Sequence, residues 1–191
     1  MSELIQELQR EYGYSDYDIA KVKYVLASLF SEFSKLILFG ALFGVLGYFY
    51  PFLFSIILLL FLRINIGGLH CKHYLSCFAL SFSILYLSIV FFPNIIHLSS
   101  ILIFGISTVC MLLNYYIGPV ASPFRPTPNS VLLNSCRNIG FFIIFIYILF
   151  VSIFHNIYFW NYYIQVGFWT IVLHTIQLFI AKMTRKRGLS K

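Results

Sequence analysis

The sequence lacks carboxylate side chains over most of its length. All six acids lie in the first 32 residues, and no Asp or Glu occurs between Phe33 and Lys191. This absence excludes several chemistries from the rest of the chain: aspartic-protease dyads, paired-carboxylate glycosidases, HExxH metalloproteases and carboxylate proton relays. Any catalysis there must use Cys, His, Ser, Tyr, Asn, Lys or Arg.

Charge of either sign is scarce. Only 10% of the 191 residues are charged, whereas 60% are hydrophobic and 20% are aromatic. This composition lies outside the range of water-soluble domains and predicts an integral membrane protein. The first 32 residues carry three bases against six acids, and the remainder carries ten bases, for a net charge of +7.

Cysteine is also sparse, and its spacing is not that of a secreted disulfide scaffold. The four cysteines are Cys71, Cys77, Cys110 and Cys136. The N-terminus is too acidic and polar for a cleaved signal peptide. We therefore expect free thiols in a reducing compartment.

Long stretches without charge predict membrane helices. They cover residues 36–62, 73–124 and 138–181. A helix needs about 20 apolar residues to span a bilayer, so the second and third stretches each predict two helices. The divisions fall near Pro93 and near residues 155–161. The expected helices are 77–92, 96–117, 138–154 and 163–181.

The positions of the basic residues indicate whether residues 36–62 form one membrane helix or two, because cytoplasmic loops retain Lys and Arg. The bases form four groups: Lys21 to Lys35, Arg63 with Lys72, Arg125 with Arg137, and Lys182 to Lys191. If all four groups are cytoplasmic, residues 36–62 must form a hairpin broken between Tyr50 and Pro51. Its second arm, about 52–62, is short enough to be partly re-entrant. We expect an all-α polytopic membrane protein with about six membrane segments and both termini cytoplasmic.

The N-terminal region predicts an amphipathic interfacial helix. Ser15 and Asp18 fit a capping box, and apolar residues then recur at helical spacing on one face. The chain is thus expected to divide into three parts: residues 1–35 at the cytoplasmic membrane surface, 36–181 in the membrane, and a basic cytoplasmic tail at 182–191. Gly40 and Gly44 could form a close helix contact, and the aromatic run 155–163 predicts an outer interfacial belt.

Polar residues concentrate between Arg63 and Cys77. Two of the five histidines and two of the four cysteines lie within residues 70–77. Between apolar segments, such a cluster predicts a functional site. A thiol nucleophile with a histidine base is one chemistry it could support, because Arg63 and Lys72 would favour the thiolate.

Helical geometry constrains which histidine could serve as the base. On a straight helix, about 10 Å of rise would separate His70 from Cys77, too far for proton transfer. The pair therefore requires a bend, which Gly67 and Gly68 would allow. His73 and Cys77 are four residues apart and meet without a bend.

Two other interpretations of the cluster stay open. His70, Cys71, His73 and Cys77 are residue types that bind zinc, which would suit a small metal-binding transporter-like protein, although their spacing is not a usual zinc pattern. Alternatively, the cysteines are small buried residues and the histidines lie at the lipid headgroups.

The motif Arg63-x4-Gly68-x-His70-x6-Cys77 resembles the signature of the accessory gene regulator B family. Members of this family are membrane endopeptidases that process quorum-sensing propeptides in Gram-positive bacteria. Length, hydrophobicity and the basic tail resemble that family throughout the chain.

The resemblance implies a cysteine endopeptidase with Cys77 as the nucleophile and His70 as the base, with His73 as the alternative base. It also implies a bend between residues 67 and 77. The substrate would be an AgrD-like propeptide whose acidic C-terminal tail is removed before cyclisation to a thiolactone or lactone. A homodimer in the cell membrane is implied, in contact with lipid and without cofactor, bound metal or nucleic acid.

Supporting residues follow from the motif and its surroundings. Arg63 and Gly68 belong to the motif, and Arg63 could bind the substrate or the oxyanion. Ser81 lies one helical turn after Cys77 and could contact the substrate. No carboxylate can orient His70, so any orienting group must be Asn, Ser, Tyr, a backbone carbonyl or water, and Asn65, Ser81 and Asn114 are candidates. Residues 118–130 hold four of the six prolines and cannot form a regular membrane span. They resemble the proline-bearing second cytoplasmic loop of the family, which would cover the catalytic segment, guide the peptide or simply connect two helices.

Overall fold

The computed structural model describes residues 16–69, 74–120 and 129–188. These residues contain no β-strand and are mostly helical, which confirms the predicted all-α polytopic class. The helices are α2 (Asp16–Val45), α3 (Phe49–Ile66), α4 (Tyr74–Tyr86), α5 (Phe92–Ile95), α6 (Ser100–Ile117), α7 (Ser130–Phe154) and α8 (Tyr158–Gly188). A π-helical turn, η1 (Leu87–Phe91), joins α4 to α5 in one continuous segment.

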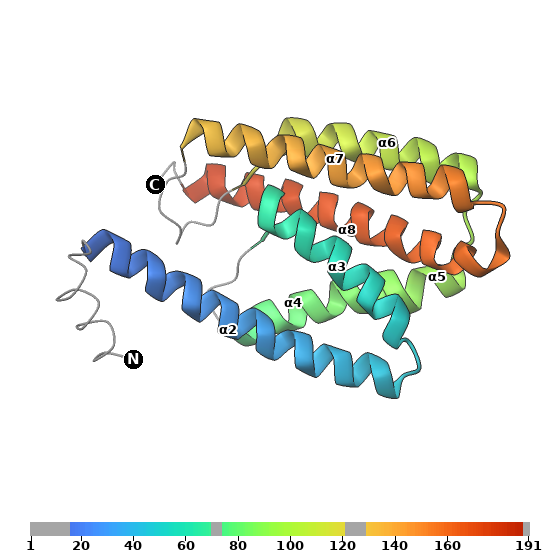
Figure 1. Cartoon of the computed structure of the whole chain (residues 1–191), viewed down its shortest axis with the longest axis horizontal. Helices are drawn as coiled ribbons and strands as arrows, with labels where there is room; N and C mark the ends of the chain where they lie inside the picture. Colours follow the sequence, from blue (N-terminus) through green and yellow to red (C-terminus); the bar gives the residue numbers. More distant parts are fainter. Residues whose placement is uncertain (1–15, 70–73, 121–128, 189–191) are drawn as a thin grey trace.

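The helices run back and forth between two ends of the molecule (Figure 1). In the described chain, five segments are long and apolar enough to cross a membrane: α3, the continuous segment from α4 to α5, α6, α7 and α8. The protein is therefore a multi-pass membrane protein. The starts of α2, α4 and α7 and the ends of α3, α6 and α8 lie toward one end (Figure 1). Except for Lys35 in the second half of α2, the basic residues of the described helices belong to the half of their helix nearer this end.

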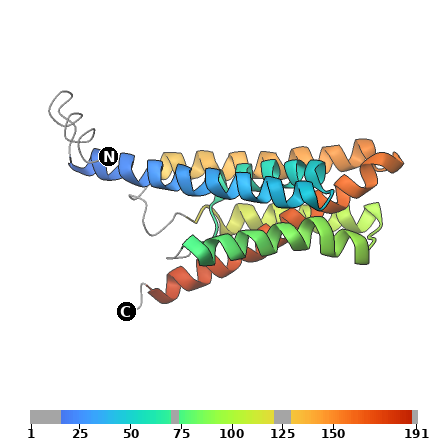
Figure 2. The ribbon, with the colours of Figure 1, turned by 90° about the horizontal axis from the view of Figure 1, so that it is seen from below.

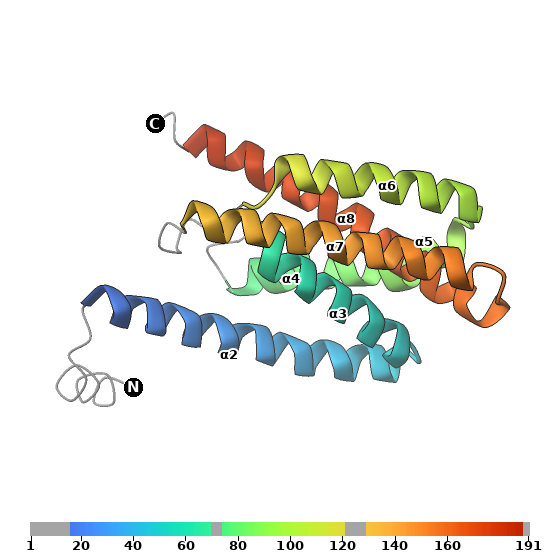
Figure 3. The same cartoon turned by 45° about the horizontal axis from the view of Figure 1, so that its top comes forward.

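α2 runs without interruption across residue 35, the predicted boundary between the surface region and the membrane part. α2 is a single helix of 30 residues, about 45 Å long at 1.5 Å per residue. No Gly or Pro lies between Asp16 and Phe39 to interrupt it. Its N-terminal half lies apart from the other helices (Figures 1 and 3), and Phe30 and Phe33 near the middle of α2 are exposed.

The second arm of the predicted hairpin is longer than expected. α3 covers 18 residues and starts before Pro51, so its length does not require a re-entrant segment. Pro51 lies in the first turn, where a backbone N–H has no partner within the helix and proline is tolerated. The turn of the hairpin is at residues 46–48, where Gly47 has a positive φ of 79°.

Two other helices extend past the charge-free stretches that predicted them. α7 begins at Ser130 rather than 138 and includes Arg137, and α8 continues through Lys182 to Gly188. Long basic side chains at a helix end can reach polar groups while their stems stay in apolar surroundings. The charges therefore marked the ends of the apolar segments and not the ends of the helices.

α8 and α3 form the centre of the molecule. α8 crosses it obliquely (Figure 2), and 67% of its apolar window is buried, against about a third for each of the other four segments. One buried cluster joins α3, α6, α7 and α8, and a second joins α2, α3, α4 and α8. Ile66, at the end of α3, packs where side chains on Gly118 and Gly140 would collide with it.

The π turn accommodates Pro93 inside a membrane segment. In an α-helix, the carbonyl of Ile89 would accept a hydrogen bond from residue 93, but proline has no N–H. The N–H of Phe92 instead donates to Leu87 O, five residues back. The hydroxyl of Tyr162 on α8 donates to Ile89 O at 2.6 Å. Tyr162 was predicted to lie in an interfacial belt, and this contact turns it inward.

Candidate active site

The chain bends at Gly67, so the segment from Gly67 to Cys77 is not one straight helix, as the resemblance implied. α3 ends at Ile66, and its cap residue Gly67 has a φ of 88°, which favours glycine. A Cβ atom on Gly67 would collide with the carbonyl oxygen of Val120. The chain is not helical again until Tyr74 within the described residues.

Two distant segments hold this bend in place. The N–H of Val120 donates to Ile66 O at 2.8 Å, and Gly67 and Val120 form an isolated parallel bridge. The Nε2 of His174, fully buried on α8, donates to the carbonyl of Gly67 at 3.1 Å. Since a carbonyl only accepts, this contact assigns the proton to Nε2. His174 had no partner at an informative spacing, so sequence analysis missed this contact.

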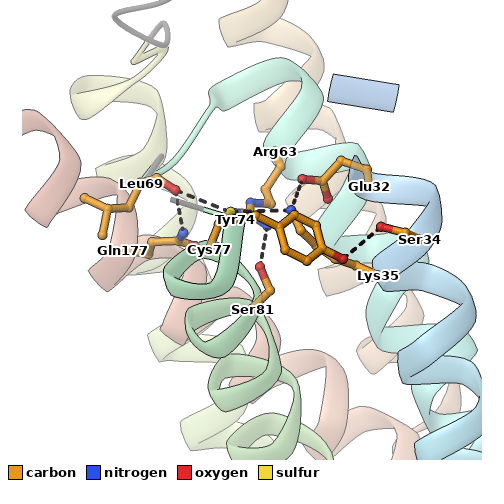
Figure 4. Close-up of polar contacts among 9 residues, drawn as sticks. All are labelled: Glu32, Ser34, Lys35, Arg63, Leu69, Tyr74, Cys77, Ser81 and Gln177. Carbon is orange, nitrogen blue, oxygen red and sulfur yellow. Dashed lines mark hydrogen bonds and ion pairs between the residues drawn. The ribbon is translucent and has the colours of Figure 1, made fainter. Parts of the chain in front are cut away.

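Arg63 ties the connection to both flanking helices (Figure 4). Its Nη1 donates to Ser81 Oγ on α4 at 3.1 Å, and its Nη2 donates to Leu69 O at 3.4 Å. The Nε2 of Gln177 on α8 also donates to Leu69 O, at 3.5 Å. Gly68 is buried between Arg63 and Gln177. The guanidinium is thus committed to fixing the backbone that leads toward Cys77.

Cys77 lies in the first turn of α4 and is a free thiol, only 8% exposed. The ammonium of Lys35 on α2 donates to its Sγ at 3.5 Å, as Figure 4 shows. Lys35 is only 3% exposed, and it also donates to Glu32 Oε1 at 2.8 Å. The ring of Tyr74 lies beside the ammonium of Lys35, with its centroid 5.6 Å from Lys35 Nζ.

Sequence analysis missed Lys35 because it counted this lysine only among the bases that set topology. A signal was present: Lys35 follows the last acid of the chain, Glu32, by three residues, a spacing that pairs side chains on a helix. Its proximity to Cys77, 42 residues away, depends on how α2 packs on α4.

The structure brings four of the predicted site residues together: Arg63, Gly68, Cys77 and Ser81. His70 and His73 lie outside the described residues, so the choice of base stays a prediction. Three of the four residues suggested as zinc ligands, His70, Cys71 and His73, also lie outside. Elsewhere in the described chain, no three His, Cys, Asp or Glu side chains could hold a metal ion.

The residues considered for orienting the histidine have partners of their own. Ser81 accepts from Arg63, and the amide of Asn65 donates to Phe61 O on its own helix. The amide of Asn114 donates to Cys110 O and to the hydroxyl of Thr175 on α8, which links α6 to α8. Asn65 and Asn114 therefore serve helix structure and packing in this conformation.

A basic cavity of about 330 Å³ lies beside the start of the proline-rich segment. Its lining includes Arg137, Lys182 and Arg185. Arg137 Nε donates to Gly118 O at 3.2 Å, and Lys182 Nζ donates to Ile117 O at 2.9 Å. Both cations thereby satisfy carbonyls at the C-terminus of α6. Residues 121–128 of the predicted loop lie outside the described residues.

The fold and the site together define a multi-pass membrane protein in which a buried free cysteine lies beside a buried lysine. The family model described as accessory gene regulator B matches residues 1–178. The chain is also 32% identical, over 141 residues, to a protein of Clostridium beijerinckii named as AgrB-like, covering 70% of this chain and 68% of that protein. No solved structure matches.

The chain therefore belongs to the accessory gene regulator B family. It is a quorum-sensing accessory gene regulator protein from a protease-like processing family.

Proposed function

We propose that the protein is a membrane cysteine endopeptidase that cleaves a propeptide and closes the released segment into a ring. The environment of Cys77 carries this proposal. Its thiol is free, contacts the ammonium of Lys35 and lies one turn before Ser81, which Arg63 binds. A cysteine in basic surroundings is the arrangement that favours a nucleophilic thiolate.

His70 acts as the general base in this mechanism. It takes the proton from the Cys77 thiol, and the thiolate attacks the carbonyl carbon of the scissile peptide bond. The tetrahedral intermediate collapses when His70 returns the proton to the leaving amine of the C-terminal tail. The remaining peptide is then bound to Cys77 as a thioester.

Ring closure follows by a second acyl transfer. A Cys or Ser side chain within the peptide loses its proton to His70 and attacks the thioester carbonyl. Cys77 leaves as a thiolate, and the product is a thiolactone or a lactone. Water would compete with this attack, and burial of Cys77 to 8% exposure limits its access. A thiolactone is close in energy to a thioester, so the step needs no ATP.

The proposed substrate is an AgrD-like propeptide with an acidic C-terminal tail. The described end of the molecule that carries Cys77 also carries Arg63, Arg137, Lys182 and Arg185. These bases would attract an acidic tail, and they would also retain this end at the cytoplasmic face. The protein would work as a homodimer in the cell membrane of a Gram-positive bacterium.

The central experiment measures propeptide cleavage by protein purified in detergent or lipid vesicles. We expect Cys77→Ala and His70→Ala each to reduce cleavage by at least about a thousandfold, because a dyad member has no substitute. Cys110→Ala is the matched control, since Cys110 is also a free thiol and is 6% exposed. Normal cleavage by Cys77→Ser would disprove the thiol mechanism, and stoichiometric zinc would favour the metal-binding alternative.

A second experiment tests which histidine is the base. We expect His73→Ala to retain cleavage and His70→Ala to lose it, as the family motif implies. The cleavage rate of each variant should be compared at equal amounts of folded protein, judged by size exclusion. The opposite result would assign the base to His73.

A further inference from the structure

Lys35 is buried at a place where its charge needs compensation. It is only 3% exposed, and an ammonium removed from water is costly unless it is paired. The described contacts of Nζ are Glu32 Oε1 at 2.8 Å, Cys77 Sγ at 3.5 Å and the face of the Tyr74 ring. The lysine therefore has one anionic partner and a sulfur.

The ion pair with Glu32 does not by itself explain the burial of Lys35. Both residues are on α2, three positions apart, and the Glu32 side chain is 38% exposed. The same pair could form at the surface of the helix. Lys35 instead extends toward α4, where Cys77 is 8% exposed and water does little to screen the two groups.

The charges around Cys77 balance when it is a thiolate. Among the described residues, Lys35 and Glu32 face it from α2, and Arg63 reaches from α3 to Ser81, one turn after Cys77. α4 contributes the neutral phenol of Tyr74, and α8 contributes the neutral amide of Gln177. Two cations and one anion leave a single positive charge, which a thiolate would neutralise. A neutral thiol is only a weak acceptor for an ammonium.

We propose that Lys35 is a catalytic residue whose ammonium stabilises the Cys77 thiolate and that Glu32 orients it. The inference rests on the proposed function and adds a residue to its mechanism. His70 removes the proton from Sγ, whereas Lys35 keeps its own protons and donates a hydrogen bond to the sulfur. The same contact stabilises the thiolate when it leaves the thioester during ring closure.

The test measures how fast iodoacetamide alkylates Cys77 as a function of pH. The protein would carry Cys71→Ala, Cys110→Ala and Cys136→Ala, so that Cys77 is its single thiol. We expect Lys35→Met to raise the midpoint of the pH profile by about one unit or more, because the thiolate loses its cation. Lys35→Arg should keep most of the original profile because it restores the charge.

Lys182→Met is the matched control. Lys182 is a partly buried lysine at the same end of the molecule, and it donates to carbonyls of α6. Its removal should leave the alkylation midpoint unchanged. An equal shift in this variant would show a general loss of positive potential and would overturn the role of Lys35.

Two further measurements separate a loss of the Lys35 charge from a disturbed fold. The alkylation rate at high pH, where every thiol is ionised, reports whether a variant has opened the site. Lys35→Gln provides a second neutral variant if Lys35→Met does not fold. An unchanged midpoint in the folded neutral variant overturns the proposal.

Cleavage assays separate this proposal from the proposed function. We expect Lys35→Met to slow propeptide cleavage by at least about tenfold, in proportion to the lost thiolate. If the midpoint shifts but Cys77→Ala still cleaves, the endopeptidase mechanism fails and the contact between Lys35 and the thiolate stands.

Discussion

At the scale of single residues, Gly67 is the most constrained position beside the site. Its φ of 88° is strained for other residues, and a Cβ atom would collide with Val120 O. We expect Gly67→Ala to lower the free energy of unfolding by about 1–3 kcal/mol from the backbone conformation alone. It should also reduce propeptide cleavage, because the bend sets the path toward Cys77.

Gly105→Ala is the comparison for this prediction. Gly105 lies within α6, and nothing is within 4 Å of the position its Cβ would take. This variant should keep its stability or gain up to about 1 kcal/mol, since alanine is the better helix former. Denaturation by SDS and cleavage assays would measure both variants. Equal behaviour of the two would contradict the assignment of Gly67.

At the scale of elements, the π turn before Pro93 depends on a hydroxyl from another helix. Tyr162 on α8 donates to Ile89 O at 2.6 Å. We expect Tyr162→Phe to destabilise the protein by about 0.5–1.5 kcal/mol, the usual range for an interhelical hydrogen bond in a membrane. The midpoint of SDS denaturation would report the loss.

The exposed Tyr158 provides the control for the loss of a tyrosine hydroxyl. It begins the same helix and is 94% exposed. Tyr158→Phe should therefore leave the denaturation midpoint unchanged. A similar decrease in both variants would mean that the hydroxyl of Tyr162 has no special part in holding η1 against α8.

At the scale of the whole molecule, the basic residues predict which end faces the cytoplasm. Asn156 lies in the turn between α7 and α8, and Met183 lies near the end of α8 at the opposite end of the molecule. In a background without native cysteines, we expect a membrane-impermeant maleimide to label Asn156→Cys in intact cells. Met183→Cys should react only after permeabilisation. The reverse pattern would overturn the predicted topology.

Charge and hydropathy predicted much of the helical organisation but not its boundaries. The chain folds back at 46–48, 96–99 and 155–157, close to the breaks predicted at Tyr50–Pro51, near Pro93 and near 155–161. The ends of the helices were misplaced because Arg137 and Lys182 lie inside helices and bind carbonyls at the end of α6. Apolar stretches report where lipid can surround a helix, whereas hydrogen bonding decides where the helix ends.

The sequence alone determined the class of the protein and its family motif, because composition and short spacings are local properties. It excluded carboxylate chemistry from every position after Glu32. Only the tertiary structure decided that Glu32, one of the early acids, is linked to Cys77 through Lys35. It also decided that His174 and Val120 hydrogen-bond the backbone at the bend of Gly67. Apart from the pair of Glu32 and Lys35, these contacts join residues that are dozens of positions apart, and packing between helices determines them.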